Sequence, residues 1–139
     1  MSGSIDDMSI RPMVQTAASN RFLPRVIIAD ESTKGLDDRL KQAVLEELML
    51  VRKTQDISLI MITHDLRAAE LVADSVAIMY CGEIVEKGAA KDFFKAPMHP
   101  YSAALMQSLP EKGFNPIPGS SPSMISPPEG CRFHPRCRR

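Results

Sequence analysis

The sequence has 139 residues, the length of one domain or of part of one, with 44% apolar and 24% charged residues, the mix of a globular protein. Lysine plus arginine and aspartate plus glutamate number 17 each, so the formal net charge is zero, and this balance argues against a chain built mainly to bind nucleic acid. The longest apolar run, Val76 to Cys81, has six residues against the roughly 20 of a membrane-spanning helix, so we expect no transmembrane segment.

Composition divides the chain into three parts. Residues 1–24 are weakly patterned and begin without an apolar leader, so we expect a cytoplasmic protein. Residues 25–109 carry strong strand and helix patterns. The third part begins at Pro110 and holds seven of the eleven prolines. Because proline lacks a backbone N–H, we expect an irregular tail there.

Apolar strands alternate with helices between residues 25 and 109. The patterns predict strands over 26–29, 57–63 and 75–80, a turn at Cys81-Gly82 with a hairpin partner over 83–85, and helices over 66–72, 89–95 and 102–108. A longer helix is predicted after Asp37, because apolar residues recur at Leu40, Val44, Leu48 and Val51. This order implies a parallel sheet with helices on its faces. Three or four strands are few for such a sheet, so we expect part of a larger α/β domain.

The first strand ends in two adjacent carboxylates, Asp30 and Glu31. Ligands of open α/β sheets lie beyond the carboxyl ends of the strands. One carboxylate at such an end can bind Mg²⁺, and the other can orient or deprotonate a water that attacks phosphorus. The alternative is an apolar strand that simply ends in two acids capping the next turn.

The second strand also ends in polar residues, Thr63-His64-Asp65. If the two strands are parallel, His64 lies at the same edge as Asp30 and Glu31, where an imidazole can hydrogen-bond a terminal phosphate. The alternative is a histidine at a strand end, with Thr63 or Asp65 as the N-cap of the next helix. We expect Asp65 to cap that helix.

The combination is more specific than either strand end alone. Asp30-Glu31, Gly35-Leu36-Asp37 and His64, thirty-four residues after Asp30, resemble the second half of an ABC-transporter ATP-binding subunit. The resemblance implies that Asp30 holds Mg²⁺ through water, that Glu31 acts on the attacking water and that His64 senses the γ-phosphate of ATP. It also implies that Asp37 belongs to the D-loop, which in the family contacts a second ATP-binding subunit.

The resemblance covers about residues 24–139. The segments at 99–105, 116–119 and 130–137 look like the C-terminal extension of the oligopeptide/dipeptide/nickel importer branch. The expected fold is α/β: a partial P-loop-type parallel sheet with flanking helices over 25–88, the C-terminal half of an ABC ATPase domain, plus an irregular Pro-rich extension over 89–139. The implied function is ATP hydrolysis coupled to import of peptides or nickel, at the inner face of the cell membrane through permease subunits.

The tail also contains candidate metal ligands. Three cysteines cannot all pair with one another, so we expect no disulfide framework. Cys131 and Cys137, with His134 between them, are residue types that bind zinc or an iron–sulfur cluster. Family members often continue to further cysteines, and some look able to hold a 4Fe–4S cluster. A four-cysteine set cannot be completed within this tail. The arginines of the tail are expected to be solvated.

Two motifs of the resembled family are missing from these 139 residues. No G-x-x-x-x-G-K-[ST] phosphate loop occurs, and no Leu-Ser-Gly-Gly-Gln signature precedes Asp30. In addition, Ser32 stands where the family usually has proline, and Lys34-Gly35 replaces the commoner Ser-Ala. Without the phosphate loop, Asp30 and Glu31 face the phosphates with net repulsion.

We therefore expect a C-terminal half of an importer ATPase subunit that is inactive by itself, as a truncated, split or engineered chain. The first alternative is a non-catalytic module that docks on a permease or on an intact ATPase subunit. The second is a small metal-binding protein that uses its cysteines and histidine. The residues do not reveal the transported substrate, because in such importers the binding protein and the permease select it.

Overall fold

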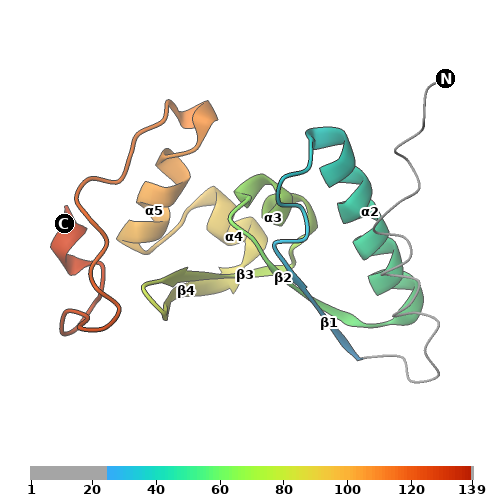
Figure 1. Ribbon diagram of the computed structural model, residues 1–139, viewed down its shortest axis with the longest axis horizontal. Helices are drawn as coiled ribbons and strands as arrows, with labels where there is room; N and C mark the ends of the chain where they lie inside the picture. The colour runs from blue at the N-terminus through green and yellow to red at the C-terminus, as the bar shows by residue number, and fades with distance from the viewer. Residues whose placement is uncertain (1–24, 139) are drawn as a thin grey trace. The chain divides into compact units, whose positions relative to one another are not determined.

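The computed structural model describes residues 25–138, and the chain divides into two compact units, Met1–Val72 and Ala73–Arg139 (Figure 1). The first 24 residues, whose sequence is weakly patterned, lie outside the described residues. Each unit has its own small sheet and helices. In the described part of the chain, no helix is both long and apolar enough to span a membrane.

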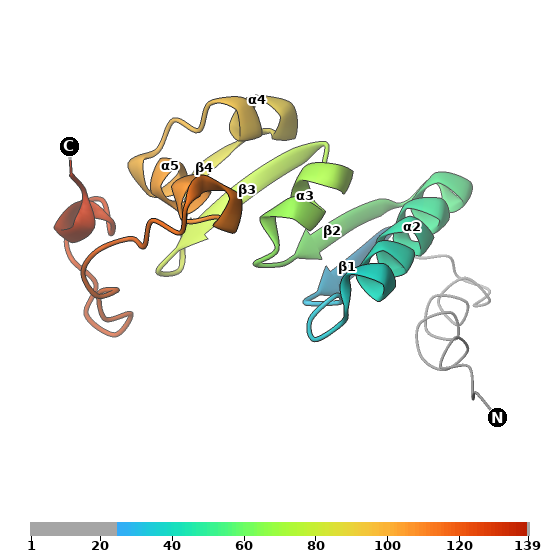
Figure 2. The same ribbon diagram turned by 90° about the horizontal axis from the view of Figure 1, so that it is seen from above.

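The first unit is a strand–helix–strand–helix arrangement. Its elements are β1 (Val26–Asp30), α2 (Asp38–Gln55), β2 (Ser58–Ile62) and α3 (Leu66–Val72). The two strands pair in parallel, in a register that runs from Val26 opposite Ser58 to Asp30 opposite Ile62. The long helix α2 makes the crossover between them and lies along one face of the pair (Figure 2). The predicted strands, their parallel direction and both helices are confirmed.

The sequence of helix α2 provides an N-cap residue, an apolar face and a C-cap residue. Asp37 is the N-cap, because its Oδ1 accepts a hydrogen bond from the Leu40 N–H at 2.9 Å. Val44 and Leu48, one turn apart, are buried and pack with Ala29 of β1 in the core of the unit. At the other end Asp56 takes the left-handed conformation, with φ of 51°, and ends the helix.

The opposite face of the two-stranded sheet is apolar and open. Side chains alternate along a strand, so Ala29 points to α2 while Ile28 points away. Ile28 is 64% exposed and its cross-strand partner Ile60 is 50% exposed. Parallel sheets usually have both faces covered. This unit therefore has the pattern of part of a larger sheet, as its sequence suggests.

The second unit begins with an antiparallel hairpin. Strand β3 (Ser75–Tyr80) pairs with β4 (Glu83–Ala89), and the two-residue turn between them has positive φ at both Cys81 (47°) and Gly82 (81°). Positive φ at both central positions is the type I′ geometry that matches the twist of a hairpin. The predicted turn is confirmed, and β4 is longer than the expected 83–85.

Each pairing stays within one unit. Parallel pairing within residues 25–138 joins β1 and β2, and β3 pairs antiparallel with β4, the hairpin partner expected from the sequence. A two-residue turn costs little loop entropy, whereas a parallel partner requires a long crossover.

Two helices and a long tail complete the second unit. Helix α4 spans Ala90–Lys95 and α5 spans Pro100–Gln107. Helix α5 starts two residues before the predicted 102, because the His99 Nδ1 accepts from the Tyr101 N–H at 3.1 Å and Pro100 suits the first helical position. Beyond it, the described tail contains only two short 3-10 helices, η1 (Pro110–Lys112) and η2 (His134–Arg136).

The tail is irregular but anchored to the hairpin by an aromatic cluster. Phe133 is 2% exposed, and its ring centroid lies 5.3 Å from that of Tyr80 and 5.4 Å from that of Tyr101. The two tyrosine rings lie 4.5 Å apart. Such pairs add to the stabilisation that burial itself provides. The second unit therefore has its own core, built from β3, α5 and the tail.

Two tail arginines hold the backbone in place, so the expectation of a solvated arginine-rich end is wrong for them. Arg136 donates from Nη2 to the Ile117 carbonyl and from Nε to the Pro118 carbonyl, both at 2.8 Å. Arg132 pairs through Nε with a Glu83 carboxylate oxygen at 2.9 Å. A proline-rich segment has few backbone N–H groups and forms no regular secondary structure, so its carbonyls lack backbone donors. The five N–H donors of an arginine guanidinium can hydrogen-bond these carbonyls instead.

Candidate functional site

Asp30 and Glu31 lie at the carboxyl end of β1, as predicted. Asp30 is the last residue of the strand and is exposed. The Glu31 N–H donates to the Ile62 carbonyl at 2.8 Å, which extends the ladder by one bond beyond the strand. Glu31 then adopts a left-handed conformation, with φ of 49°, and the chain turns away from the strand direction. A non-glycine residue in this region marks a constrained position.

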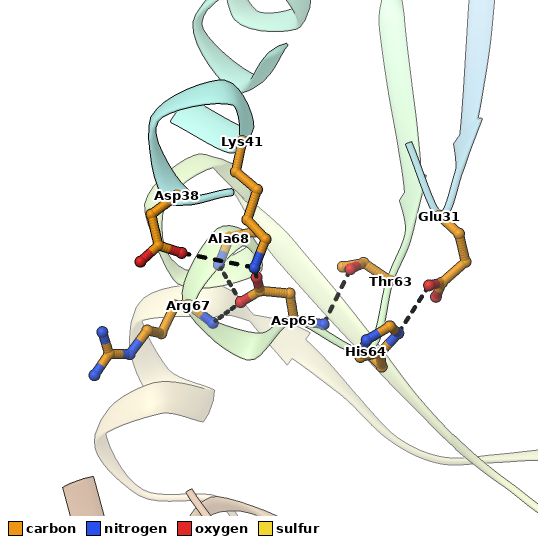
Figure 3. Close-up of polar contacts among 8 residues, drawn as sticks. All are labelled: Glu31, Asp38, Lys41, Thr63, His64, Asp65, Arg67 and Ala68. Carbon is orange, nitrogen blue, oxygen red and sulfur yellow. Dashed lines mark hydrogen bonds and ion pairs between the residues drawn. The ribbon is translucent and has the colours of Figure 1, made fainter. Parts of the chain in front are cut away.

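Glu31 and His64 are in direct contact. The Glu31 Oε2 lies 2.8 Å from the His64 Nδ1 (Figure 3). The His64 side chain is 75% exposed and that of Glu31 is 31% exposed, so the pair adds little to stability. Its effect is orientation: with Nδ1 directed at the carboxylate, Nε2 is the ring nitrogen left to meet a ligand. The predicted meeting of two strand ends at one sheet edge is confirmed for this pair.

The residues on both sides of His64 are fixed by hydrogen bonds. The Asp65 N–H donates to the Thr63 Oγ1 at 3.0 Å. The Asp65 Oδ1 accepts from the backbone N–H groups of Arg67 and Ala68, both at 3.1 Å (Figure 3). Asp65 therefore caps α3, which confirms the sequence expectation. The two residues that flank His64 are therefore hydrogen-bonded to each other and to the start of α3.

Lys41 of α2 connects the helix after Asp37 to the loop that carries His64. Its Nζ lies 3.4 Å from the Asp65 Oδ2 and 3.8 Å from the Asp38 Oδ1. Burial acts to raise the pKa of Asp65, but hydrogen bonds from Ala68 and Lys41 and the lysine charge outweigh it and hold that pKa below its ordinary value. Sequence reasoning missed this contact, because no periodic pattern marks a pair 24 residues apart.

Asp37 uses its side chain to cap α2 and is otherwise exposed. It follows a tight loop in which the Lys34 N–H donates to the Glu31 carbonyl at 2.9 Å and Gly35 has a φ of 76°. That positive φ favours glycine, which explains Gly35 at this position. The loop ties Asp37 to Glu31 along the chain, while contact of Asp37 with a second subunit stays a prediction.

No group of three or more histidine, cysteine, aspartate or glutamate side chains suited to a metal ion occurs within residues 25–138. Magnesium often takes only one or two protein carboxylates and keeps several waters, so the exposed Asp30 suits a water-mediated role. A zinc or iron–sulfur centre needs more ligands. The described side chains therefore fit Mg²⁺ better than either of these.

The tail cysteines do not form the predicted ligand set with His134. The Cys131 Sγ lies 3.7 Å from the Nε2 of His99, while the His134 Nδ1 lies 3.0 Å from the Cys131 carbonyl oxygen. Cys137 is half-buried, and all three cysteines are free thiols. One thiol near one imidazole is fewer than the four ligands of a structural zinc site.

Comparison with known proteins gives a match in the C-terminal part of the chain. Residues 85–139 match the family model described as the oligopeptide/dipeptide transporter, C-terminal region. A longer part of the chain is similar to peptide-transport ATP-binding proteins. It is 41% identical over 135 residues to the dipeptide transport ATP-binding protein DppD of Haemophilus influenzae, an alignment of 94% of this chain and 40% of that protein.

Two further relatives give the same result. The chain is 43% identical over 119 residues to DppD of Bacillus subtilis, covering 82% of this chain and 36% of the relative. It is 40% identical over 124 residues to the dipeptide transport ATP-binding protein DppF of Escherichia coli, covering 84% and 36%. The chain thus spans about two fifths of the length of the curated relatives it matches. These alignments reach well beyond the tail into the unit that carries Glu31 and His64.

Proposed function

We propose that this chain carries the hydrolysis residues of an ATP-binding subunit of an ABC importer for peptides. The observation that supports the proposal most is the 2.8 Å contact between Glu31 and His64 at the carboxyl ends of two parallel strands. This edge is where ligands bind in open α/β sheets. The similarity to dipeptide transport ATP-binding proteins supports ATP as the nucleotide and favours peptides over nickel as the transported substrate.

Each site residue then has a distinct task in phosphoryl transfer. Asp30, exposed at the strand end, would hold Mg²⁺ through water, and the ion would neutralise phosphate charge. Glu31 orients the attacking water and accepts its proton. His64, held through Nδ1 by Glu31, presents Nε2 to the γ-phosphate. Asp65 and Lys41 keep the His64 loop in place.

The phosphate-binding groups come from outside these 139 residues. No phosphate-loop motif occurs in the sequence, and two adjacent carboxylates without such a loop repel the phosphates. We propose that the chain acts within an assembly with a second ATP-binding subunit, which Asp37 faces, and with permease subunits that hold it at the inner face of the membrane.

The test uses the assembled transporter with site variants of this chain. Glu31→Gln should retain bound Mg-ATP but lose turnover, because the amide keeps the shape and loses the base. Glu70→Gln, an exposed substitution on α3 with the same charge change, should leave turnover unchanged. Unchanged turnover in Glu31→Gln would refute the role of Glu31.

A binding measurement on the purified chain separates the proposal from its alternative. Calorimetry should show no Mg-ATP binding at millimolar concentration for the chain alone, because the phosphate cradle is absent. Micromolar binding that Asp30→Ala abolishes would instead indicate an intermolecular or rearranged site. Capture of permease subunits regardless of Mg-ATP, with full turnover in every variant, would establish a docking module.

A further inference from the structure

The second unit contains a cavity that the proposed ATP site does not use. It has a volume of about 310 Å³ and is lined by residues of α5 and of the proline-rich chain that follows this helix. These two segments are drawn in orange to red in Figure 1. The helix contributes Pro100, Ala103, Ala104 and Gln107, which recur at helical spacing. Small side chains at the two central positions leave the space that the cavity occupies.

The floor of the cavity is apolar. Ile117, Phe133 and the rings of Pro116 and Pro118 line it, and Phe133 is almost fully buried in the aromatic cluster. Small-molecule sites commonly measure about 300–1,000 Å³, so this cavity is at the lower end of that range. It accommodates one apolar side chain with its neighbouring polar groups and is too small for a long acyl chain.

The charged side chains among the described lining residues are positive. They are Arg136 and Arg138, and no aspartate or glutamate of residues 25–138 lines the cavity. Arg136 already donates to the Ile117 and Pro118 carbonyls, so it holds the wall. Arg138 is exposed, and its guanidinium is accessible to a ligand. A carboxylate suits the planar donor pair of arginine.

We propose that this cavity binds the C-terminal residue of a short peptide. The terminal carboxylate pairs with Arg138, and an apolar last side chain lies on Ile117 and Ala104. A free amino acid fits less well, because no described lining residue has an acidic side chain to pair with its ammonium group. The Asn115 side chain also lines the cavity, and its Nδ2 donates to the Lys112 carbonyl at 3.1 Å, so its Oδ1 remains an acceptor.

The test is an NMR titration of the full ¹⁵N-labelled chain with two matched probes. N-acetyl-alanyl-leucine has the carboxylate, and N-acetyl-alanyl-leucinamide lacks only that charge. The acid should shift the amide signals of Ala104, Gln107 and Arg138 with a dissociation constant of roughly 0.1–1 mM, as expected for so small a ligand. The amide probe should bind at least about tenfold more weakly, which equals about 1.4 kcal/mol.

Variants of the lining locate the binding. Arg138→Gln should weaken the acid probe to the level of the amide, and Ala104→Leu should abolish binding of both by filling the cavity. Arg39→Gln, the same charge change on the exposed side of α2, should have no effect. Equal affinity for the two probes, or wild-type affinity in either lining variant, would overturn the proposal. Acetate that binds as tightly as the acid probe would also overturn it, because the apolar floor would then contribute nothing. No outcome depends on nucleotide, so a failed ATP site would not affect this result.

Discussion

Removing the Phe133 ring should destabilise the second unit more than any exposed change in its tail. The ring is 2% exposed and contacts both tyrosines of the chain, with centroids 5.3 and 5.4 Å away. Deleting a buried phenylalanine costs about 3–5 kcal/mol, a figure that includes the cavity left behind. Because the native stability of a unit this small is itself only about 5 kcal/mol or less, Phe133→Ala should leave it largely unfolded.

The assay follows from the composition of the chain. It has no tryptophan and two tyrosines, Tyr80 and Tyr101, both in this cluster, so near-ultraviolet circular dichroism reports on the cluster directly. Phe133→Leu keeps most of the volume and should cost only about 1–2 kcal/mol, which makes a urea transition measurable. Phe114→Ala removes the same ring at a position that is 70% exposed and should change stability by less than about 0.5 kcal/mol. Equal losses in Phe133→Leu and Phe114→Ala would refute the idea that the tail is anchored by this ring.

Three further predictions concern charged and capping residues. Lys41→Met should raise the pKa of Asp65 toward its ordinary value, measured by carboxyl ¹³C titration, while an unchanged pKa would show that the backbone donors alone lower it. Burial acts to raise the pKa of Glu86, but hydrogen bonds from the Met98 and His99 N–H groups outweigh burial and lower that pKa overall. The Glu86 carboxylate therefore stabilises the fold at pH values above its ordinary pKa of 4.5, and this contribution is lost as the pH falls through the lower pKa of the folded state. Glu86→Gln should therefore flatten the acid side of the stability–pH curve, and a curve of unchanged shape would contradict this. Asp37→Ala should cost about 1 kcal/mol by removing the N-cap of α2, whereas Asp37→Asn should be nearly neutral, as measured by urea unfolding.

Local features of the fold were predictable because their causes are local. Apolar β-branched runs gave β1 and β2, and the capping role of Asp65 followed from its place before an apolar helix. The antiparallel partner of β3 was predictable for the same reason, because the Cys81-Gly82 turn directly follows the strand. Only the length of β4 was underestimated, since the strand extends to Ala89, beyond the expected 85.

The candidate site divides in the same way. The contact between Glu31 and His64 follows from one geometric rule, because parallel strands end at a common edge. The contact of Lys41 with Asp65 has no such rule, since a charged side chain on a helix and one on a distant loop meet only once the fold is known. Arg136 was misjudged for a related reason: the carbonyls it satisfies become neighbours only after the tail has folded back.

The first residue of the second unit, Ala73, determines where a chimaera of two related chains should be joined. The family match starts at residue 85, inside β4, but the unit starts at Ala73. A chimaera joined at residue 85 would take β3 from a different parent and replace Tyr80, the ring against which Phe133 packs edge-on. A junction between Val72 and Ala73 keeps the hairpin, the aromatic cluster and the tail from a single parent, so swaps made there should fold as modules.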